Sequence, residues 1–270
     1  MEGFAVIVGI TVASKSYHDI ISLTALLGFL TGFFLTSYSM ISNDIYDLEV
    51  DRVNQPSRPL PAGEVKPGNA RIMSILLVLS GVVVSVPLGI ANFSIALIFA
   101  VLVWYYNFQG KRFGLLGNAL VSLSLAIPYI YGSIAIGIFG LNLAYLLALT
   151  SFLAGMGREV LKGIADVKGD ALRKVRTLAI SRGIRLSTVV VAGFFLCAVI
   201  SSALPVVYGL LGKSLFVYVI LICIPDAIFL FLSIRVVSLK NESDSLRLKS
   251  IALVGMMTGL LAYFVAGILA

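Results

Sequence analysis

The sequence predicts an all-α, polytopic membrane protein with about nine transmembrane helices bundled around a central cavity. Hydrophobic residues make up 59% of the 270 residues and charged residues only 12%, whereas soluble domains carry about 25% charged residues. The mean hydropathy is +1.04. Most apolar runs are near-continuous and about 20 residues long, which is the length of a membrane-crossing helix, and they lack the alternation of a β-barrel strand. We therefore expect one transmembrane domain over residues 1–270.

The helices are expected to follow one another through loops that are short on one side of the membrane and long and charged on the other. Their predicted ranges are 3–14, 20–42, 70–90, 93–108, 115–138, 141–157, 186–210, 214–236 and 249–269. The first range is too short for a bilayer about 30 Å thick. We expect that helix either to insert only in part or to lack upstream residues.

The distribution of positive charge predicts the orientation. Of the 20 Lys and Arg residues, 18 lie in or beside the long charged loops, and only Lys15 and Lys213 lie on the opposite side. The positive-inside rule places the charged loops in the cytoplasm. The protein is therefore expected in the cell membrane as a multi-pass protein with its charged side facing the cytoplasm. The net charge of +7 follows mostly from this topology, so it does not indicate nucleic acid as a partner.

The first candidate site is an acidic cluster just after the second apolar run. Asp44, Asp47 and Asp51 have i, i+3, i+7 spacing, so on a helix they share one face. Three like charges on one face repel unless a cation binds them. Oxygen ligands with no His or Cys nearby favour Mg²⁺, which commonly takes phosphate oxygens as its other ligands. Asn43 is either a neutral ligand or a helix cap.

A second acidic pair, Asp166 and Asp170, has i, i+4 spacing and follows the sixth apolar run. Each cluster therefore ends a comparable set of helices. Two pseudo-symmetric halves would bring the clusters face to face across a central cavity. The sequence thus predicts a site for Mg²⁺ and a diphosphate between them.

Several other residues are candidates for binding the anionic groups of a substrate. Arg58 lies between Pro56 and Pro59, which stiffen its loop, and a guanidinium binds phosphate oxygens in pairs. The other candidates are Tyr106, Lys111, Arg158 and Lys162. Any of these cations is alternatively an anchor at the membrane boundary.

Asp226 is the one acid inside an apolar run. An acid within a membrane span is costly and usually marks a functional or paired position. It either contacts substrate in the cavity, pairs with a basic residue, or relieves the helix interrupted by Pro225.

Together these residues resemble the UbiA superfamily of intramembrane prenyltransferases. The first motif of that superfamily, NDxxDxxxD followed by a proline-flanked Arg, is represented by residues 43–58, and its DxxxD motif by residues 166–170. The stretches 106–118 and 157–170 are most similar to the archaeal members that make digeranylgeranylglyceryl phosphate. The basic Arg-Pro segment that opens the first helix in this superfamily is absent here.

This resemblance implies a function. The expected reaction is the Mg²⁺-dependent transfer of a geranylgeranyl group from geranylgeranyl diphosphate to geranylgeranylglyceryl phosphate, which forms the second ether bond of archaeal lipids. The resemblance implies catalytic roles for Asp44, Asp47, Lys162, Asp166 and Asp170, with Asp51 as a further metal ligand. The partners are then a prenyl diphosphate, a lipid-like phosphorylated acceptor and the bilayer.

Two alternatives remain at this stage. An aromatic acceptor, as in quinone or chlorophyll-type prenyl transfer, requires the same scaffold. A transporter of cations or organic anions is less consistent, because transporters place acids near the bilayer midplane, where only Asp226 is expected.

Overall fold

A computed structural model describes residues 2–16, 18–109, 114–167, 177–239 and 242–270, and within these residues its secondary structure is helical throughout. The long helices are α2 (Leu23–Tyr46), α4 (Pro67–Ser85), α5 (Ile90–Phe108), α6 (Leu115–Ala135), α7 (Leu143–Ala165), α10 (Ile184–Ser202), α12 (Leu215–Val237) and α13 (Glu242–Leu269). The shorter elements are α1 (Glu2–Ser14), η1 (His18–Ile21), α3 (Leu48–Asn54), η2 (Val86–Leu88), α9 (Leu178–Arg182), α11 (Leu204–Val207) and η4 (Gly212–Ser214).

The predicted multi-pass membrane architecture is confirmed. Eight helices in the described part of the chain are long and apolar enough to cross a membrane. The ninth predicted helix is α1, which has 13 residues and is shorter than a span requires.

Two predicted helix ends differ from the structure where it matters most. We predicted that the second helix ends at residue 42 and the sixth at residue 157, but α2 continues to Tyr46 and α7 to Ala165. Hydropathy detects only the part of a helix that lies in lipid, whereas the backbone hydrogen bonds continue into the polar residues. Accordingly, the N–H of Asp47 donates to the Asn43 carbonyl and the N–H of Asp166 to the Lys162 carbonyl.

A third difference concerns the predicted helix over 186–210. It divides at Ala203 into α10 and the short α11. Pro205 lies near the start of α11. Proline lacks the N–H that a helix interior needs, but its fixed φ suits a first turn, so a new helix begins there.

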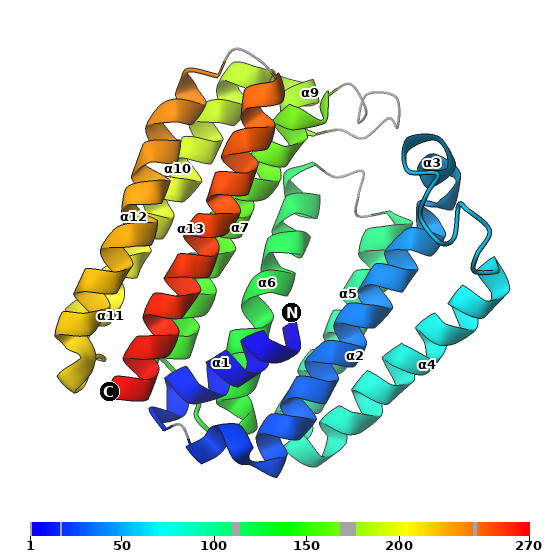
Figure 1. Cartoon of the computed structure of the whole chain (residues 1–270). Coiled ribbons are helices and arrows are strands. Elements are labelled where there is room, and N and C mark those ends of the chain that lie inside the picture. Colours follow the sequence, from blue (N-terminus) through cyan, green and yellow to red (C-terminus); the bar gives the residue numbers. More distant parts are fainter. Residues whose placement is uncertain (1, 17, 110–113, 168–176, 240–241) are drawn as a thin grey trace.

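The long helices lie side by side in one bundle, with α6 and α7 in its centre (Figure 1). One flank is formed by α2, α4 and α5, and the other by α10, α12 and α13. Contacts join α6 to α7, α7 to α10, α12 to α13 and α2 to α4. The short helices α3 and α9 lie at the same end of the bundle, and the C-terminus lies at the opposite end.

The outer surface of the bundle is apolar, as expected for contact with lipid. Ile72, Ile200 and Ile234 are 60%, 68% and 72% exposed, and similar residues cover most of the long helices. Because lipid is as apolar as these side chains, helix association depends on close packing rather than on hydrophobic burial.

The contact between α1 and α6 illustrates this close packing. A Cβ added at Gly132 would collide with the backbone carbonyl of Val6 and lie 2.8 Å from the backbone nitrogen of Ile10. Only glycine permits this approach, and it brings α1 against the centre of the bundle.

Side-chain caps define where two of the spans begin. The Ser22 hydroxyl accepts from the N–H of Ala25 at the start of α2, and the Asn142 side chain accepts from the N–H of Ala144 at the start of α7. Each cap satisfies a backbone donor that the helix leaves free. Both caps lie at the end opposite the acidic residues, so α2 and α7 run in the same direction and end near each other.

Candidate active site

The last turn of α2 and the start of α3 carry the first acidic cluster. Asp47 is the residue at which α2 ends and α3 begins, with φ −91° and ψ 1°. Its carboxylate accepts a hydrogen bond of 3.1 Å from the side-chain amide of Asn43. Asn43 therefore orients Asp47 rather than capping the helix through its side chain.

Arg58 compensates the charge of the other two acids. Its Nη1 lies 2.7 Å from Asp51 and 3.1 Å from Asp44. The Asp51 side chain is only 6% exposed, and a buried carboxylate is costly unless a cation and hydrogen bonds accompany it. Arg58 thus ties the loop after α3 back to the end of α2, in addition to its predicted role towards a diphosphate.

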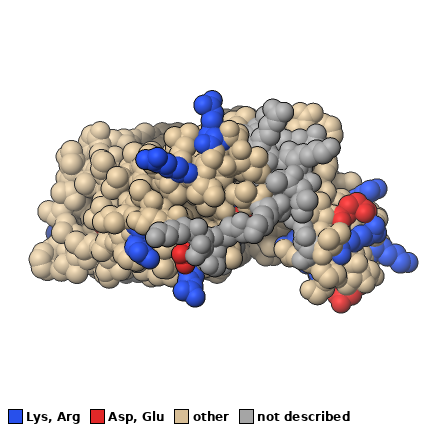
Figure 2. Space-filling model, turned by 90° about the horizontal axis from the view of Figure 1, so that it is seen from above, with Lys and Arg blue, Asp and Glu red and all other residues tan. Residues whose placement is uncertain are grey.

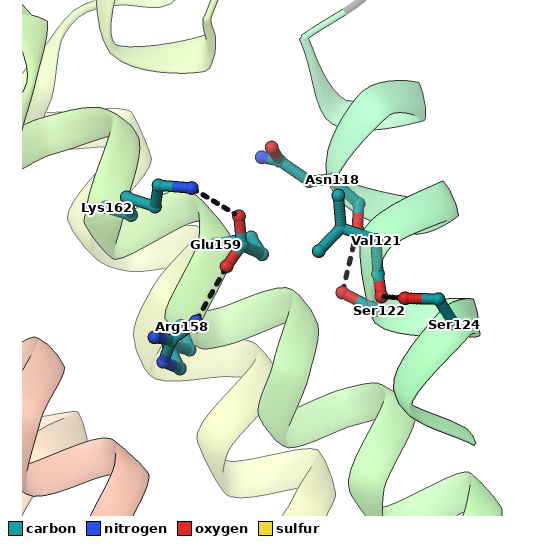
Figure 3. Close-up of polar contacts among 7 residues, drawn as sticks. All are labelled: Asn118, Val121, Ser122, Ser124, Arg158, Glu159 and Lys162. Carbon is teal, nitrogen blue, oxygen red and sulfur yellow. Dashed lines mark hydrogen bonds and ion pairs between the residues drawn. The ribbon is translucent and has the colours of Figure 1, made fainter. Parts of the chain in front are cut away.

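The second wall of the site is the last two turns of α7 (Figure 3). Glu159 is buried, with a side chain that is 7% exposed. It accepts from Arg158 Nη1 at 2.8 Å and from Lys162 Nζ at 3.4 Å. Asp166 follows Lys162 by four residues and ends the helix. Glu159, Lys162 and Asp166 therefore follow one another along the end of α7, so a basic residue lies between two acidic ones.

A cavity of about 460 Å³ separates these two walls. Its lining combines the end of α2, α3, the end of α5, the start of α6, the end of α7 and Thr177 before α9. The lining residues are Asn43, Tyr46, Asp47, Val50, Tyr106, Asn107, Phe108, Gln109, Gly114, Gly117, Asn118, Glu159, Lys162, Gly163, Asp166 and Thr177. The predicted meeting of the two acidic clusters is thus realised for Asp47 and Asp166.

The predicted site residues fall into three groups. Those that line the cavity are Asn43, Asp47, Tyr106, Lys162 and Asp166. Those that form ion pairs beside it without lining it are Asp44, Asp51, Arg58 and Arg158. Lys111 and Asp170 lie outside the described residues, so their roles stay predictions.

Asp226 is not brought to this cavity. It lies on α12, where its carboxylate accepts from the Ser202 hydroxyl at 2.9 and 3.0 Å, and it lines a separate small cavity with Thr150 and Tyr263. Its predicted contact with substrate has no support from this position. Among the described residues, its hydrogen-bond partner is the Ser202 hydroxyl and not the basic residue that was the other alternative.

Several polar residues of the lining were not predicted from the sequence. The most important is Glu159, and the others are Tyr46, Asn107, Gln109, Asn118 and Thr177. Glu159 had a signal in the sequence: it precedes Asp166 by seven residues, the same spacing as Asp44 and Asp51. This spacing alone did not show that Glu159 faces the cavity, because Glu159 lies outside the DxxxD pair and beside two cations in the sequence.

The carboxylates of the cavity suit a metal ion that is bound partly by the protein and partly by a substrate. Among the described residues, no group of three or more His, Cys, Asp or Glu side chains is placed to hold a metal alone. Asp47 and Asp166 line opposite parts of one cavity instead. Mg²⁺ is commonly bound by one or two carboxylates together with substrate phosphates, so this arrangement fits Mg²⁺ with a diphosphate.

Positive charge also surrounds this end of the molecule. Viewed from above, the surface carries Lys and Arg side chains around its edge, with Asp and Glu beside them (Figure 2). Such a distribution attracts anions towards this end of the molecule.

The ion pair of Arg58 with the buried Asp51 yields a first prediction. Arg58→Ala leaves the Asp51 carboxylate buried without its cation, so we expect a loss of roughly 1–3 kcal/mol in unfolding free energy, reduced from that of a fully buried pair because Arg58 is part exposed. Thermal unfolding in detergent measures this. Asp51→Asn in the Arg58→Ala background is expected to restore part of the loss.

The matched control is the pair of Arg52 and Glu49, which lies 2.8 Å apart on α3 with side chains 55% and 80% exposed. Arg52→Ala is expected to change stability by less than about 0.5–1 kcal/mol. Equal effects of Arg58→Ala and Arg52→Ala would contradict the structural role of Arg58.

Comparison with known proteins agrees with the fold. The family model described as "UbiA prenyltransferase family" matches residues 3–267. The chain is 34% identical over 267 residues to a digeranylgeranylglyceryl phosphate synthase of Archaeoglobus fulgidus. The aligned region covers 98% of this chain and 90% of that protein.

Two solved structures are also similar. One, described as concerning digeranylgeranylglyceryl phosphate synthase in membranes, has 32% identity and a TM-score of 0.82 and covers 98% of this chain and 93% of that one. The other, a UbiA homolog from Archaeoglobus fulgidus bound to DMAPP and Mg²⁺, has 14% identity and a TM-score of 0.63 and covers 97% and 95%. The second likeness concerns the fold alone. Because the family model matches nearly the whole chain and the synthase is similar over 98% of it, this chain belongs to the UbiA prenyltransferase family.

Proposed function

We propose that this prenyltransferase moves a geranylgeranyl group from geranylgeranyl diphosphate to the free hydroxyl of geranylgeranylglyceryl phosphate, with Mg²⁺ as cofactor. The observation that carries the proposal is the cavity in which Asp47 of the first acidic motif and Asp166 of the second line one space with Lys162. The synthases at 34% and 32% identity support this choice of substrates, and the homolog bound to DMAPP and Mg²⁺ supports the metal.

The carboxylates and cations of the site suit a diphosphate leaving group. Asp47 and Asp166 would hold Mg²⁺, which would supply positive charge to the diphosphate oxygens. Lys162 adds a further positive charge at the same cavity. Because the diphosphate becomes more negative as the allylic C–O bond breaks, these contacts are stronger in the transition state than with bound substrate, and this difference lowers the barrier.

The prenyl chain has an apolar place next to the charged site. A second cavity of about 140 Å³, lined mainly by apolar residues of α5 and α6, shares Tyr106 with the first. Each CH₂ group buried there contributes about 0.8 kcal/mol. The apolar walls exclude water from the allylic cation, and the ring of Tyr106 lies at the boundary, where an aromatic face stabilises a cation.

The orientation of the site is part of the proposal. The charge asymmetry of the loops predicts that the cavity opens to the cytoplasm, where phosphorylated metabolites and Mg²⁺ are available.

In a variant whose Cys197 and Cys223 are replaced, we expect Ala62→Cys to react with an impermeant thiol reagent only in inside-out vesicles. Phe139→Cys, at the other end of the bundle, is expected to react only in intact cells. The reverse pattern would contradict this orientation.

The catalytic proposal is tested by replacing one acid in the cavity and a neighbouring acid outside it. We expect Asp47→Ala to lower ether formation by at least about 10²-fold, because it removes charge that binds the leaving group. Glu49→Ala is the matched control, since Glu49 is exposed and absent from the cavity lining, and its activity is expected to stay near wild type.

Purified proteins are incubated with geranylgeranyl diphosphate, Mg²⁺ and either geranylgeranylglyceryl phosphate or an aromatic acceptor, and products are identified by mass spectrometry. Near-wild-type turnover by Asp47→Ala would end its assigned role. Transfer to the aromatic compound alone would leave the prenyltransferase but replace the acceptor.

A further inference from the structure

Forming an ether from an alcohol requires a group that removes the hydroxyl proton, and this step is not explained by the binding of the diphosphate. The inference below rests on the proposed function. Among the described residues of the cavity lining, the carboxylates are Asp47, Glu159 and Asp166. Asp47 and Asp166 belong to the two motifs that are proposed to hold the metal, and a carboxylate bound to a metal is a poor proton acceptor. Glu159 lies outside both motifs.

The position of Glu159 along α7 also suits a contact with the reacting part of a donor. It precedes Asp166 by seven residues of α7, and seven residues of helix extend about 10 Å. Since α7 ends at Asp166, Glu159 lies further from the charged end of the bundle and closer to its apolar middle. If the diphosphate of the donor binds at Asp166 and its prenyl chain extends beyond Tyr106, the reacting carbon lies between Asp166 and Tyr106.

The side chain of Glu159 faces the cavity. Figure 3 shows it on the side of α7 that faces α6, from which Asn118 projects into the same space. Arg158 and Lys162 hold the carboxylate from its two sides, at 2.8 and 3.4 Å. These contacts compensate its charge in a buried position and restrict it to one conformation.

We propose that Glu159 is the catalytic base for the acceptor hydroxyl. The bond between C1 of the donor and its diphosphate oxygen breaks, and the electron pair leaves with the diphosphate. A lone pair of the acceptor hydroxyl forms the new C1–O bond, and the proton of that hydroxyl passes to a Glu159 carboxylate oxygen. The proton is later released to solvent with the products. An ion-paired carboxylate is basic enough for this step, because an alcohol oxygen bonded to an allylic cation is strongly acidic.

A purely structural role predicts different kinetics. If Glu159 only positioned Lys162, its replacement would disturb the diphosphate site, and the KM for the donor would rise. Loss of a base instead lowers kcat for ether formation and leaves donor binding intact. It also leaves the allylic cation to react with residual water, so prenyl alcohol increases relative to ether.

The test compares Glu159→Gln with wild type and with Glu49→Gln, an exposed acid outside the cavity. Glutamine keeps the shape of the side chain, but its single acceptor oxygen can take the hydrogen bond of only one of Arg158 and Lys162, which donate to different oxygens of Glu159. We expect kcat for ether formation to fall about 10²- to 10⁴-fold, with the donor KM within about twofold of wild type. The ratio of prenyl alcohol to ether is expected to rise, and Glu49→Gln is expected to match wild type.

The inference is overturned if Glu159→Gln forms ether at the wild-type rate, or if only the donor KM changes. If Glu159→Gln does not fold, Glu159→Asp replaces it; a base moved by one CH₂ group is expected to give an intermediate kcat with an unchanged donor KM, and a changed KM alone again overturns the inference. If the wild-type protein forms no ether with any acceptor, the proposed function itself fails, which is a separate and recognisable result.

Discussion

The constraint on which the rest of the structure depends is the placement of negative charge at the boundary of an apolar bundle. Carboxylates on α2, α3 and α7 lie where the spans end, and several are buried or part buried. Such charges are stable only with cations of their own. Arg58 supplies one for Asp44 and Asp51, and Arg158 and Lys162 supply them for Glu159. Asp47 and Asp166 line the cavity between these pairs, which is where a substrate with its metal would complete the balance of charge.

Much of the fold followed from the sequence because the bilayer restricts the possible answers. A backbone in lipid has to satisfy its hydrogen bonds internally, so apolar runs of sufficient length are helices. Eight described spans and the short α1 agree with the nine predicted helices. The boundaries that failed, at the ends of α2 and α7, lie in polar sequence. Hydropathy contains no information there, and only the continued backbone hydrogen bonds extend the helix.

The candidate site was predictable only in part, for the same reason. Repeated acids on one helix face identified Asp47 and Asp166, and the structure brings them to one cavity. The sequence did not reveal that Arg58 already pairs with Asp44 and Asp51, because this contact depends on how the loop after α3 folds back. Glu159 was not proposed as a site residue because the sequence does not show that its side chain faces the cavity. Asp226 was included because acids in spans are rare, but its partner Ser202 on α10 is visible only in the folded chain.

The most direct test of the central claim is an experimental structure with a non-reactive analogue of geranylgeranyl diphosphate and Mn²⁺ in place of Mg²⁺, since the anomalous signal of Mn²⁺ locates the metal. We expect the metal and the diphosphate to lie in the cavity between Asp47 and Asp166, with the prenyl chain directed past Tyr106. A diphosphate bound with its metal away from either carboxylate would contradict it.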